Sequence, residues 1–128
     1  MKFEFIVRSR FCSPFPGCIN ESPLHPNYDP VSQVLSDDGG LGLEHMRDWA
    51  GEGTKNLSLV MSGELESYEW GGEMYSAEMN KHITRIYCQL DDDIYSDIET
   101  VRFFKLFMAW KQFIDQPLAI GMRQCIEL

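Results

Sequence analysis

A segment rich in carboxylates and aromatic rings carries the clearest chemistry in this sequence. Residues 63–99 include ten acidic residues and two basic ones, Lys81 and Arg85, a net charge of −8. Residues 1–62 carry −3 and residues 100–128 carry +2, so the acidity is local. A concentrated negative field attracts basic proteins or cations and repels nucleic acid and anionic membranes. The charge pattern therefore predicts a basic protein partner, with no role in binding nucleic acid or membrane.

The predicted binding surface depends on the period-2 alternation of residues 56–70. Leu57, Leu59 and Leu65 fall on one parity, so the opposite parity is expected to face solvent from one side of a strand. Aromatic rings there would be anchors, and carboxylates would pair with Arg or Lys. The alternative is that Trp70 packs under a loop and the glutamates are only solvated. The predicted partner-binding residues are Glu64, Glu66, Tyr68, Glu69, Trp70, Glu73, Asp91, Asp92 and Asp93.

The run Asp91-Asp92-Asp93 is acidic enough to suggest calcium. Calcium loops use oxygen ligands at alternating positions with a Gly and a distant Glu, and that spacing is absent here. The expectation is a strand-to-helix loop whose acids suit the positive end of a helix dipole. These acids would extend the negative patch.

The residues Cys12, Cys18 and His25 lie in one Pro-rich stretch, where they could bind metal or supply a thiol. Zinc sites usually contain a C-x-x-C pair, and the spacing here is wider. A metal site would need a fourth ligand from Cys125 or His45, and a Cys12–Cys18 disulfide is also open. We predict no metal and no cofactor, and keep a small metal- or thiol-dependent enzyme as the alternative function.

Signatures of catalysis are missing from the sequence. It contains no nucleophile elbow and no H-E-x-x-H pattern. Gly39-Gly40-Leu41-Gly42 lacks the Lys-Ser/Thr that a phosphate loop needs. We therefore expect that the chain is not an enzyme, with a non-catalytic regulatory subunit as a further alternative.

The elements that would position these residues follow from periodicity and punctuation. Alternating apolar residues predict strands, and Gly and Pro mark turns. Leu43 to Ala50 has helical spacing, and Gly51 and Gly53 are expected to stop that helix. In order, the N-terminal prediction is a strand over 2–8, a loop over 9–30, a helical turn over 31–35, the short helix, and a strand over 56–70.

The second half predicts two more strands and a long helix. The strands cover residues 73–79 and 82–90, and Ser96 to Glu99 has the S-x-x-E form of a capping box. The helix over 97–114 carries a broad apolar stripe, which either covers a sheet or forms a homodimer face. Residues 118–128 suit a last strand.

Together these elements predict an α+β fold formed as a single domain over residues 1–128. An antiparallel meander would contain residues 2–8, 56–70, 73–79 and 82–90, with the long C-terminal helix packed on one face. No apolar run approaches the roughly 20 residues that span a bilayer. The first residues lack a signal-peptide pattern, so the expectation is a cytoplasmic protein with reduced cysteines.

The order of these features resembles the immunity proteins of bacterial polymorphic toxin systems, including those of contact-dependent growth inhibition. The resemblance covers residues 56–115 and depends on the Glu69-Trp70-Gly71-Gly72-Glu73-Met74 strand end, the strand pair that follows it, and the late helix with Phe107 to Phe113. The resemblance implies a small acidic cytoplasmic protein that binds a cognate toxin domain, often a basic nuclease, and occludes its active site. The Pro-rich loop with Cys12 and Cys18 is outside this pattern.

Overall fold

The computed structural model describes residues 1–23, 25 and 28–128. Strands and helices in this part of the chain occur in separate runs, the order of an α+β fold, as the sequence predicts. The elements are β1 (Lys2–Arg10), β2 (Ser13–Asn20), α1 (Pro30–Ser36), α2 (Leu43–Ser62), β3 (Ser67–Gly71), β4 (Tyr75–Asn80), β5 (Ile83–Cys88), β6 (Asp91–Glu99), α3 (Thr100–Ile114) and β7 (Arg123–Glu127).

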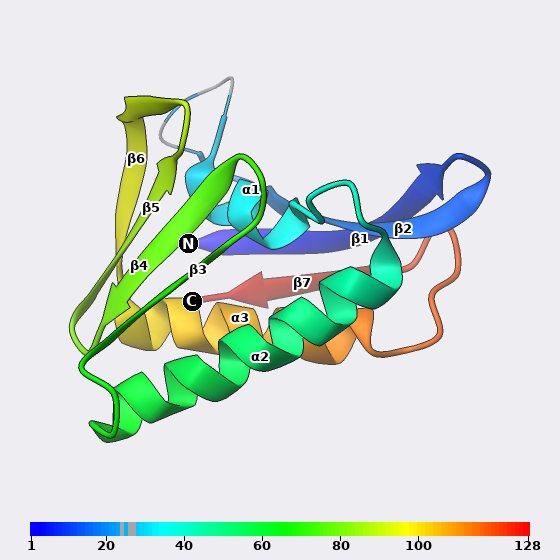
Figure 1. The fold of residues 1–128 in the computed structure, drawn as a ribbon. Helices are drawn as coiled ribbons and strands as arrows, with labels where there is room; N and C mark the ends of the chain where they lie inside the picture. Colours follow the sequence, from blue (N-terminus) through cyan, green and yellow to red (C-terminus); the bar gives the residue numbers. More distant parts are fainter. Residues whose placement is uncertain (24, 26–27) are drawn as a thin grey trace.

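The strands form two antiparallel sheets, which corrects the prediction of one sheet that includes residues 2–8. The first has three strands in the order β2-β1-β7, and the second is a four-stranded meander, β3-β4-β5-β6. Figure 1 shows the meander at one end of the molecule, with α2 and α3 running side by side beneath the three-stranded sheet. Helix α1 contacts β2 of one sheet and β4, β5 and β6 of the other.

The core lies where α3 meets both sheets and α2. The predicted apolar stripe of α3 is confirmed, because Phe103, Phe107, Trp110 and Ile114 are fully buried. The Phe5 ring of β1 lies 5.2 Å from the Trp110 ring in an edge-on arrangement. The long C-terminal helix therefore packs on a sheet, and burial of its aromatic rings accounts for much of the hydrophobic stabilisation.

Helix α2 replaces the strand predicted over residues 56–70. Its buried positions follow a helical period: Met46, Ala50, Gly53, Leu57 and Val60. The alternation of Leu57, Leu59 and Met61 is a coincidence of a helix that is apolar on more than one face. Gly51 and Gly53 do not end this helix; it ends at Gly63, whose φ of +86° is the left-handed conformation of a helix C-cap.

The middle of the predicted 9–30 loop, residues 13–20, is the strand β2, which pairs with β1 through a hairpin turned at Phe11 and Cys12. Prolines argue against a central strand, but β2 is an edge strand, where a missing N–H is tolerated. Pro14 and Pro16 lie in it opposite Ser9 and Val7. The predicted helical turn over 31–35 is confirmed as α1.

The acidic run at Asp91 begins a strand and is not a strand-to-helix loop. Residues 91–99 form β6, which pairs with β5, so Ser96 lies within a strand and does not cap the helix. Helix α3 starts at Thr100, and the N-cap position, Glu99, makes no side-chain capping bond. The buried Thr100 hydroxyl instead donates to the Asn80 carbonyl at 2.6 Å, because tertiary contact replaces the local cap.

The connection between α1 and α2 is held by two carboxylates. Asp37 accepts hydrogen bonds from the backbone amides of Met74 at 2.8 Å and Gly39 at 2.9 Å, which ties α1 to the β3–β4 turn. Asp38 is buried and accepts from the amides of Gly40 and Gly42, each at 3.0 Å.

Asp38 should make stability depend on pH. Burial raises the pKa of Asp38. The hydrogen bonds from the amides of Gly40 and Gly42 and the Arg10 guanidinium outweigh that effect, so the pKa is below the ordinary 3.8. The stabilisation is complete above pH 3.8 and is lost as pH falls through the lower folded-state pKa. Asp38→Asn should cost about 1–3 kcal/mol at pH 6, as for other hydrogen bonds to a charged group. Urea unfolding at pH 6 and at pH 3 should show this difference shrinking; an unchanged difference would contradict the assignment.

No helix in the described ranges is long and apolar enough to cross a membrane.

Candidate protein-binding face

The four-stranded sheet has one face against the helices and one toward solvent. The buried face carries Trp70, Ala77, Met79 and Ile86. Because side chains alternate across a strand, the intervening residues point outward. We call this outer surface the open face, formed by Ser67, Glu69, Glu78, Asn80, Ile83, Arg85, Tyr87, Tyr95, Asp97 and Glu99.

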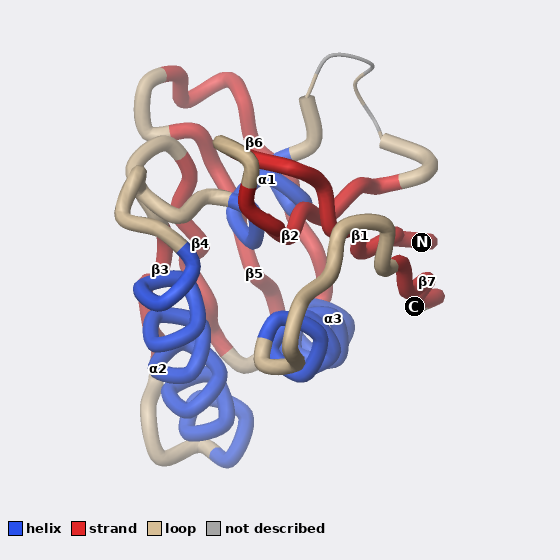
Figure 2. Tube along the Cα trace, turned by 90° about the vertical axis from the view of Figure 1, so that its right-hand side faces the viewer, coloured by secondary structure: helices blue, strands red, loops and turns tan. Residues whose placement is uncertain are grey.

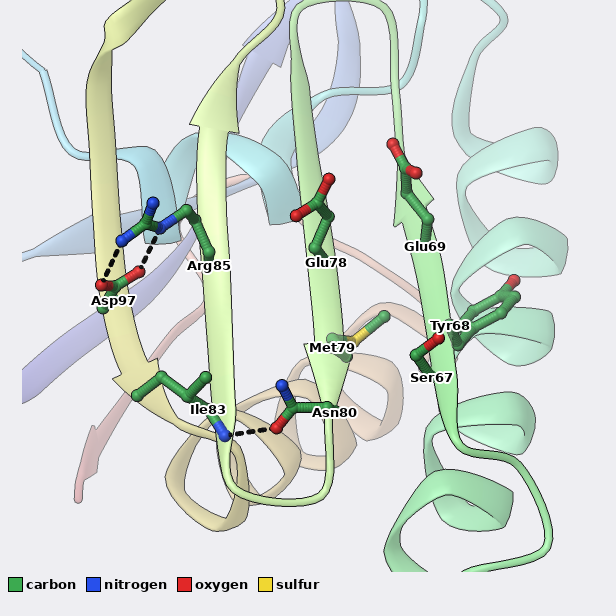
Figure 3. A pocket seen from close by; sticks show the side chains of 9 residues that line it. All are labelled: Ser67, Tyr68, Glu69, Glu78, Met79, Asn80, Ile83, Arg85 and Asp97. Carbon is green, nitrogen blue, oxygen red and sulfur yellow. Dashed lines mark hydrogen bonds and ion pairs between the residues drawn. The ribbon is translucent and has the colours of Figure 1, made fainter.

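Strand register places four charged residues in one row across the open face. Glu69 lies opposite Glu78, Glu78 opposite Arg85, and Arg85 opposite Asp97. Figure 3 shows this row on four neighbouring strands, with the Arg85 side chain turned toward Asp97 and away from Glu78. The row carries three negative charges and one positive charge.

Arg85 pairs with Asp97, at one end of the row. Its Nε and Nη2 atoms donate to the two carboxylate oxygens of Asp97 at 2.7 and 2.8 Å. The guanidinium also lies 4.4 Å from the centroid of the Tyr95 ring. The hydrogen bond from Arg85 lowers the pKa of Asp97, which keeps that carboxylate ionised. A bidentate pair stacked on an aromatic ring is well ordered, so Arg85 is not available to Glu78.

Glu69 and Glu78 therefore face each other without an ion pair, although the charge of Arg85 on the next strand still acts on Glu78. Within the described part of the chain, neither carboxylate has a Lys or Arg at ion-pair distance. The hydroxyl of Tyr87 donates to Glu69 Oε1 at 2.8 Å. This hydrogen bond, followed by burial and the charges of Glu69 and Glu78, raises the pKa of Tyr87. Like charges directly opposite each other on a sheet are destabilising.

The centre of the open face is hollowed into a pocket of about 480 Å³. Glu69, Glu78, Arg85 and Asp97 line it, with Ile83 exposed at one side. Tyr68 is half-buried at its rim. A shallow pocket with carboxylate walls fits a basic side chain better than an apolar ligand.

The predicted binding residues do not form one patch. Glu69 lies on the open face, whereas Glu64 and Glu66 lie in the α2–β3 connection beyond one end of the sheet. Glu73 and Asp91 to Asp93 lie at the opposite end, where the Gln89 amide donates to the Met74 carbonyl at 2.8 Å. Five strand residues separate the two ends, roughly 17 Å.

The predicted exposure of Trp70 is wrong. Only 3% of this residue is exposed, and its Nε1 donates to the Trp49 carbonyl at 2.9 Å. Its ring lies 4.6 Å from that of Phe107. Tyr68 shares the inward parity, and burial raises its pKa. Trp70 thus belongs to the core, because the true strand begins at Ser67 and not at residue 56.

Of the residues considered for a metal site, Cys18 and His25 line the same surface hollow, whereas Cys12 lies apart from them. Cys12 is exposed at the hairpin tip, whereas Cys18 is buried in β2, about 20 Å along an extended strand. Burial, followed by the charge of Asp29, raises the pKa of the Cys18 thiol, so it is a poor ligand or nucleophile. The His25 ring stacks on Tyr28 at 4.0 Å. Cys88 is buried in β5.

Elsewhere in the described residues, Glu4, Glu21 and Cys125 come close enough to share an ion. Both carboxylates already have cations nearby: Lys2 Nζ lies 3.6 Å from Glu21 and Arg123 Nη1 lies 3.4 Å from Glu4. These ion pairs compete with any metal.

Sequence reasoning missed the central residues of the open face, Glu78, Arg85, Tyr87, Tyr95 and Asp97. A usable signal was present, since residues 75–80 and 83–88 alternate with period 2 around a short turn. Pairing them across that turn would have placed Glu78 beside Arg85. The choice of Asp97 as the Arg85 partner needed β6, which the sequence did not predict.

Comparisons with protein-family models, curated proteins and solved structures found no match for this chain. The fold and this site define an α+β protein with an acidic, solvent-facing sheet.

Proposed function

We propose that this protein is an inhibitor of the immunity-protein type, which binds a basic partner, a cognate toxin domain, through the open face of its four-stranded sheet. The observation that supports this proposal is the pair Glu69 and Glu78, which are in register, exposed and not ion-paired with a described Lys or Arg. The resemblance to immunity proteins suggests the class of inhibitor, and the local negative charge suggests that the partner is basic.

The energetics favour a basic ligand. Two carboxylates facing each other on a sheet weaken the free protein, by about 0.2–1 kcal/mol for a pair of this kind. An Arg or Lys from a partner would relieve that repulsion and add charge-assisted hydrogen bonds. The acids at both ends of the sheet would steer a basic protein toward the same face.

The mechanism would be occlusion. Nucleases and other enzymes that act on polyanions bind their substrates with Arg and Lys. An acidic sheet face that pairs with those side chains would block the substrate path without any catalysis by the inhibitor. Tyr87 and Tyr95 would provide aromatic contact area beside the carboxylates. Such an inhibitor would act in the cytoplasm of the cell that makes it.

Charge reversal on the open face tests the proposal. Wild-type protein would be bait in source-cell extract at about 50 mM salt and at several-fold higher salt, and an enriched basic partner would then be purified. Glu69→Lys/Glu78→Lys should weaken its affinity at least tenfold, because buried interface charges often contribute about 2 kcal/mol or more.

The matched control is Asp48→Lys/Glu52→Lys, which changes the net charge equally on exposed positions of α2. This variant should keep the partner, apart from a modest loss of on-rate. An equal loss of affinity in both double variants would show that only net charge matters. Full binding by the Glu69→Lys/Glu78→Lys variant would reject the open face as the interface.

A further inference from the structure

Strand β7 ends the three-stranded sheet with a free edge. Phe3 pairs with Ile126 and Phe5 with Gln124, and the Leu128 amide donates to the Met1 carbonyl at 2.8 Å. In an antiparallel ladder, hydrogen-bonded pairs alternate, so the even-numbered residues of β7 bond to β1. The amides and carbonyls of Arg123, Cys125 and Glu127 therefore point away from the sheet. Figure 2 shows β7 at its outer rim, with α3 beneath.

The opposite edge of the same sheet is closed. By the same register logic, Pro14 and Pro16 occupy outward-facing positions of β2, where proline supplies no N–H. The next outward amide, that of Cys18, donates to the Ser36 hydroxyl at 3.0 Å. Proline on an edge strand is a common protection against strand pairing. In β7 the described residues include no proline, and the hydrogen bond found at its outward edge runs from Lys105 Nζ to the Glu127 carbonyl, at 3.3 Å.

Arg123 and Glu127 of β7 are complementary in charge, and Arg123, 63% exposed in its side chain, also lies 3.4 Å from Glu4 of the same chain. In a two-fold antiparallel pairing centred on Cys125, Arg123 of one copy would lie opposite Glu127 of the other, and the reverse. Opposite charges facing each other across strands stabilise a sheet. All three outward residues would fall at hydrogen-bonded positions. Residues 100–128 carry a net charge of +2, so two copies would meet at the least acidic part of the chain.

Helix α3 adds apolar surface beside this edge. Val101 and Met108 are 57% and 37% exposed, and they share a helical stripe with Lys105. The contact from Lys105 to Glu127 locates this stripe at the free edge of β7. These two side chains would add apolar contact area beside the strand edge in an assembly.

We propose that two copies of this chain associate through β7, joining their three-stranded sheets into one continuous six-stranded antiparallel sheet with α3 packed against its counterpart. The Arg123 to Glu127 pairs fix the register, and Val101 and Met108 become buried. This dimer does not depend on the proposed inhibitor function, since the open face lies on the other sheet and remains free.

Light scattering during size-exclusion chromatography tests the proposal on the full chain. Wild-type protein at about 100 μM should elute as a dimer of the 14.8 kDa chain. Arg123→Glu or Glu127→Arg should each weaken dimerisation at least tenfold, because like charges would then face each other. The double variant Arg123→Glu/Glu127→Arg should restore dimerisation to within about threefold, which only pairing between these two positions predicts.

A backbone variant gives an independent readout. Cys125→Pro removes an amide from the free edge and leaves the ladder to β1 intact, so it should yield a folded monomer. Cys125→Ser should remain a dimer. Circular dichroism melts would check that each variant is folded. A monomeric wild type, or a dimer unchanged by both Glu127→Arg and Cys125→Pro, would overturn the proposal.

Discussion

Replacing Trp70 with alanine is expected to lower the free energy of unfolding by about 3–5 kcal/mol, the range for large aromatic residues in a core. The ring packs 4.6 Å from Phe107 and its Nε1 bonds to the Trp49 carbonyl, so the substitution removes both packing and a hydrogen bond between α2 and β3. It would also leave a cavity between β3 and two helices that cannot collapse freely.

Urea unfolding monitored by circular dichroism is the measurement, with Leu90→Ala as control. Leu90 is 76% exposed in the β5–β6 turn, so its truncation should change stability by no more than about 0.5 kcal/mol. Similar small effects in both variants would mean that Trp70 is a surface residue, as the sequence alone had suggested.

Gly53→Ala is expected to destabilise the protein by about 1–3 kcal/mol through overpacking. In an exposed helix interior the same change stabilises by about 1 kcal/mol, because glycine is a poor helix former. Here a Cβ at position 53 would lie 2.7 Å from Phe107 Cζ and 2.7 Å from Trp70 Nε1, both rings held in the core. Close approach of α2 to these rings therefore requires glycine.

The control is two residues away in the same helix. A Cβ at Gly51 would meet only Lys111 Cε at 3.3 Å, the far end of a flexible side chain that can move. Gly51→Ala should therefore be neutral or stabilising by up to about 1 kcal/mol. Chemical denaturation of both variants gives the comparison, and a stabilising Gly53→Ala would contradict the packing assigned to α2.

Because Trp70 is in the core and Glu69 faces solvent, variants at these two neighbouring residues should affect stability and binding differently. An anchor proposed from sequence is a core residue, whereas its neighbour Glu69 faces solvent on the same strand. Variants at Trp70 would lose binding by unfolding, and variants at Glu69 and Glu78 should lose it while folded. The second group is therefore the informative one for function.

Local signals identified the elements that have a long, regular pattern. The apolar stripe predicted α3, and the alternation of apolar and polar residues predicted β4 and β5, because helical and strand periods differ enough to be recognised within a few turns or residues. The α+β class and the antiparallel pairing of β4 with β5 are confirmed on that basis. The acidity of residues 63–99 is also a property of the sequence, independent of the fold.

Elements that depend on distant partners escaped prediction. Gly51 and Gly53 suggest a helix end, but tertiary packing against Phe107 and Trp70 outweighs their low propensity, and α2 continues to Ser62. Pro14 and Pro16 suggest a loop, but an edge position in β2 tolerates them. Local propensity amounts to about 1 kcal/mol per residue or less outside proline, so burial of a large core decides these cases.

The sequence by itself determined three features of this protein: a locally acidic segment, aromatic residues within that segment, and a long helix that packs on a sheet. Only the tertiary structure decided which carboxylates act together. Glu69 and Glu78 are nine positions apart, and Arg85 and Asp97 are twelve apart, so their association depends on strand register. Register is set by which residues reach the core, and a shift of one residue would turn every side chain to the other face.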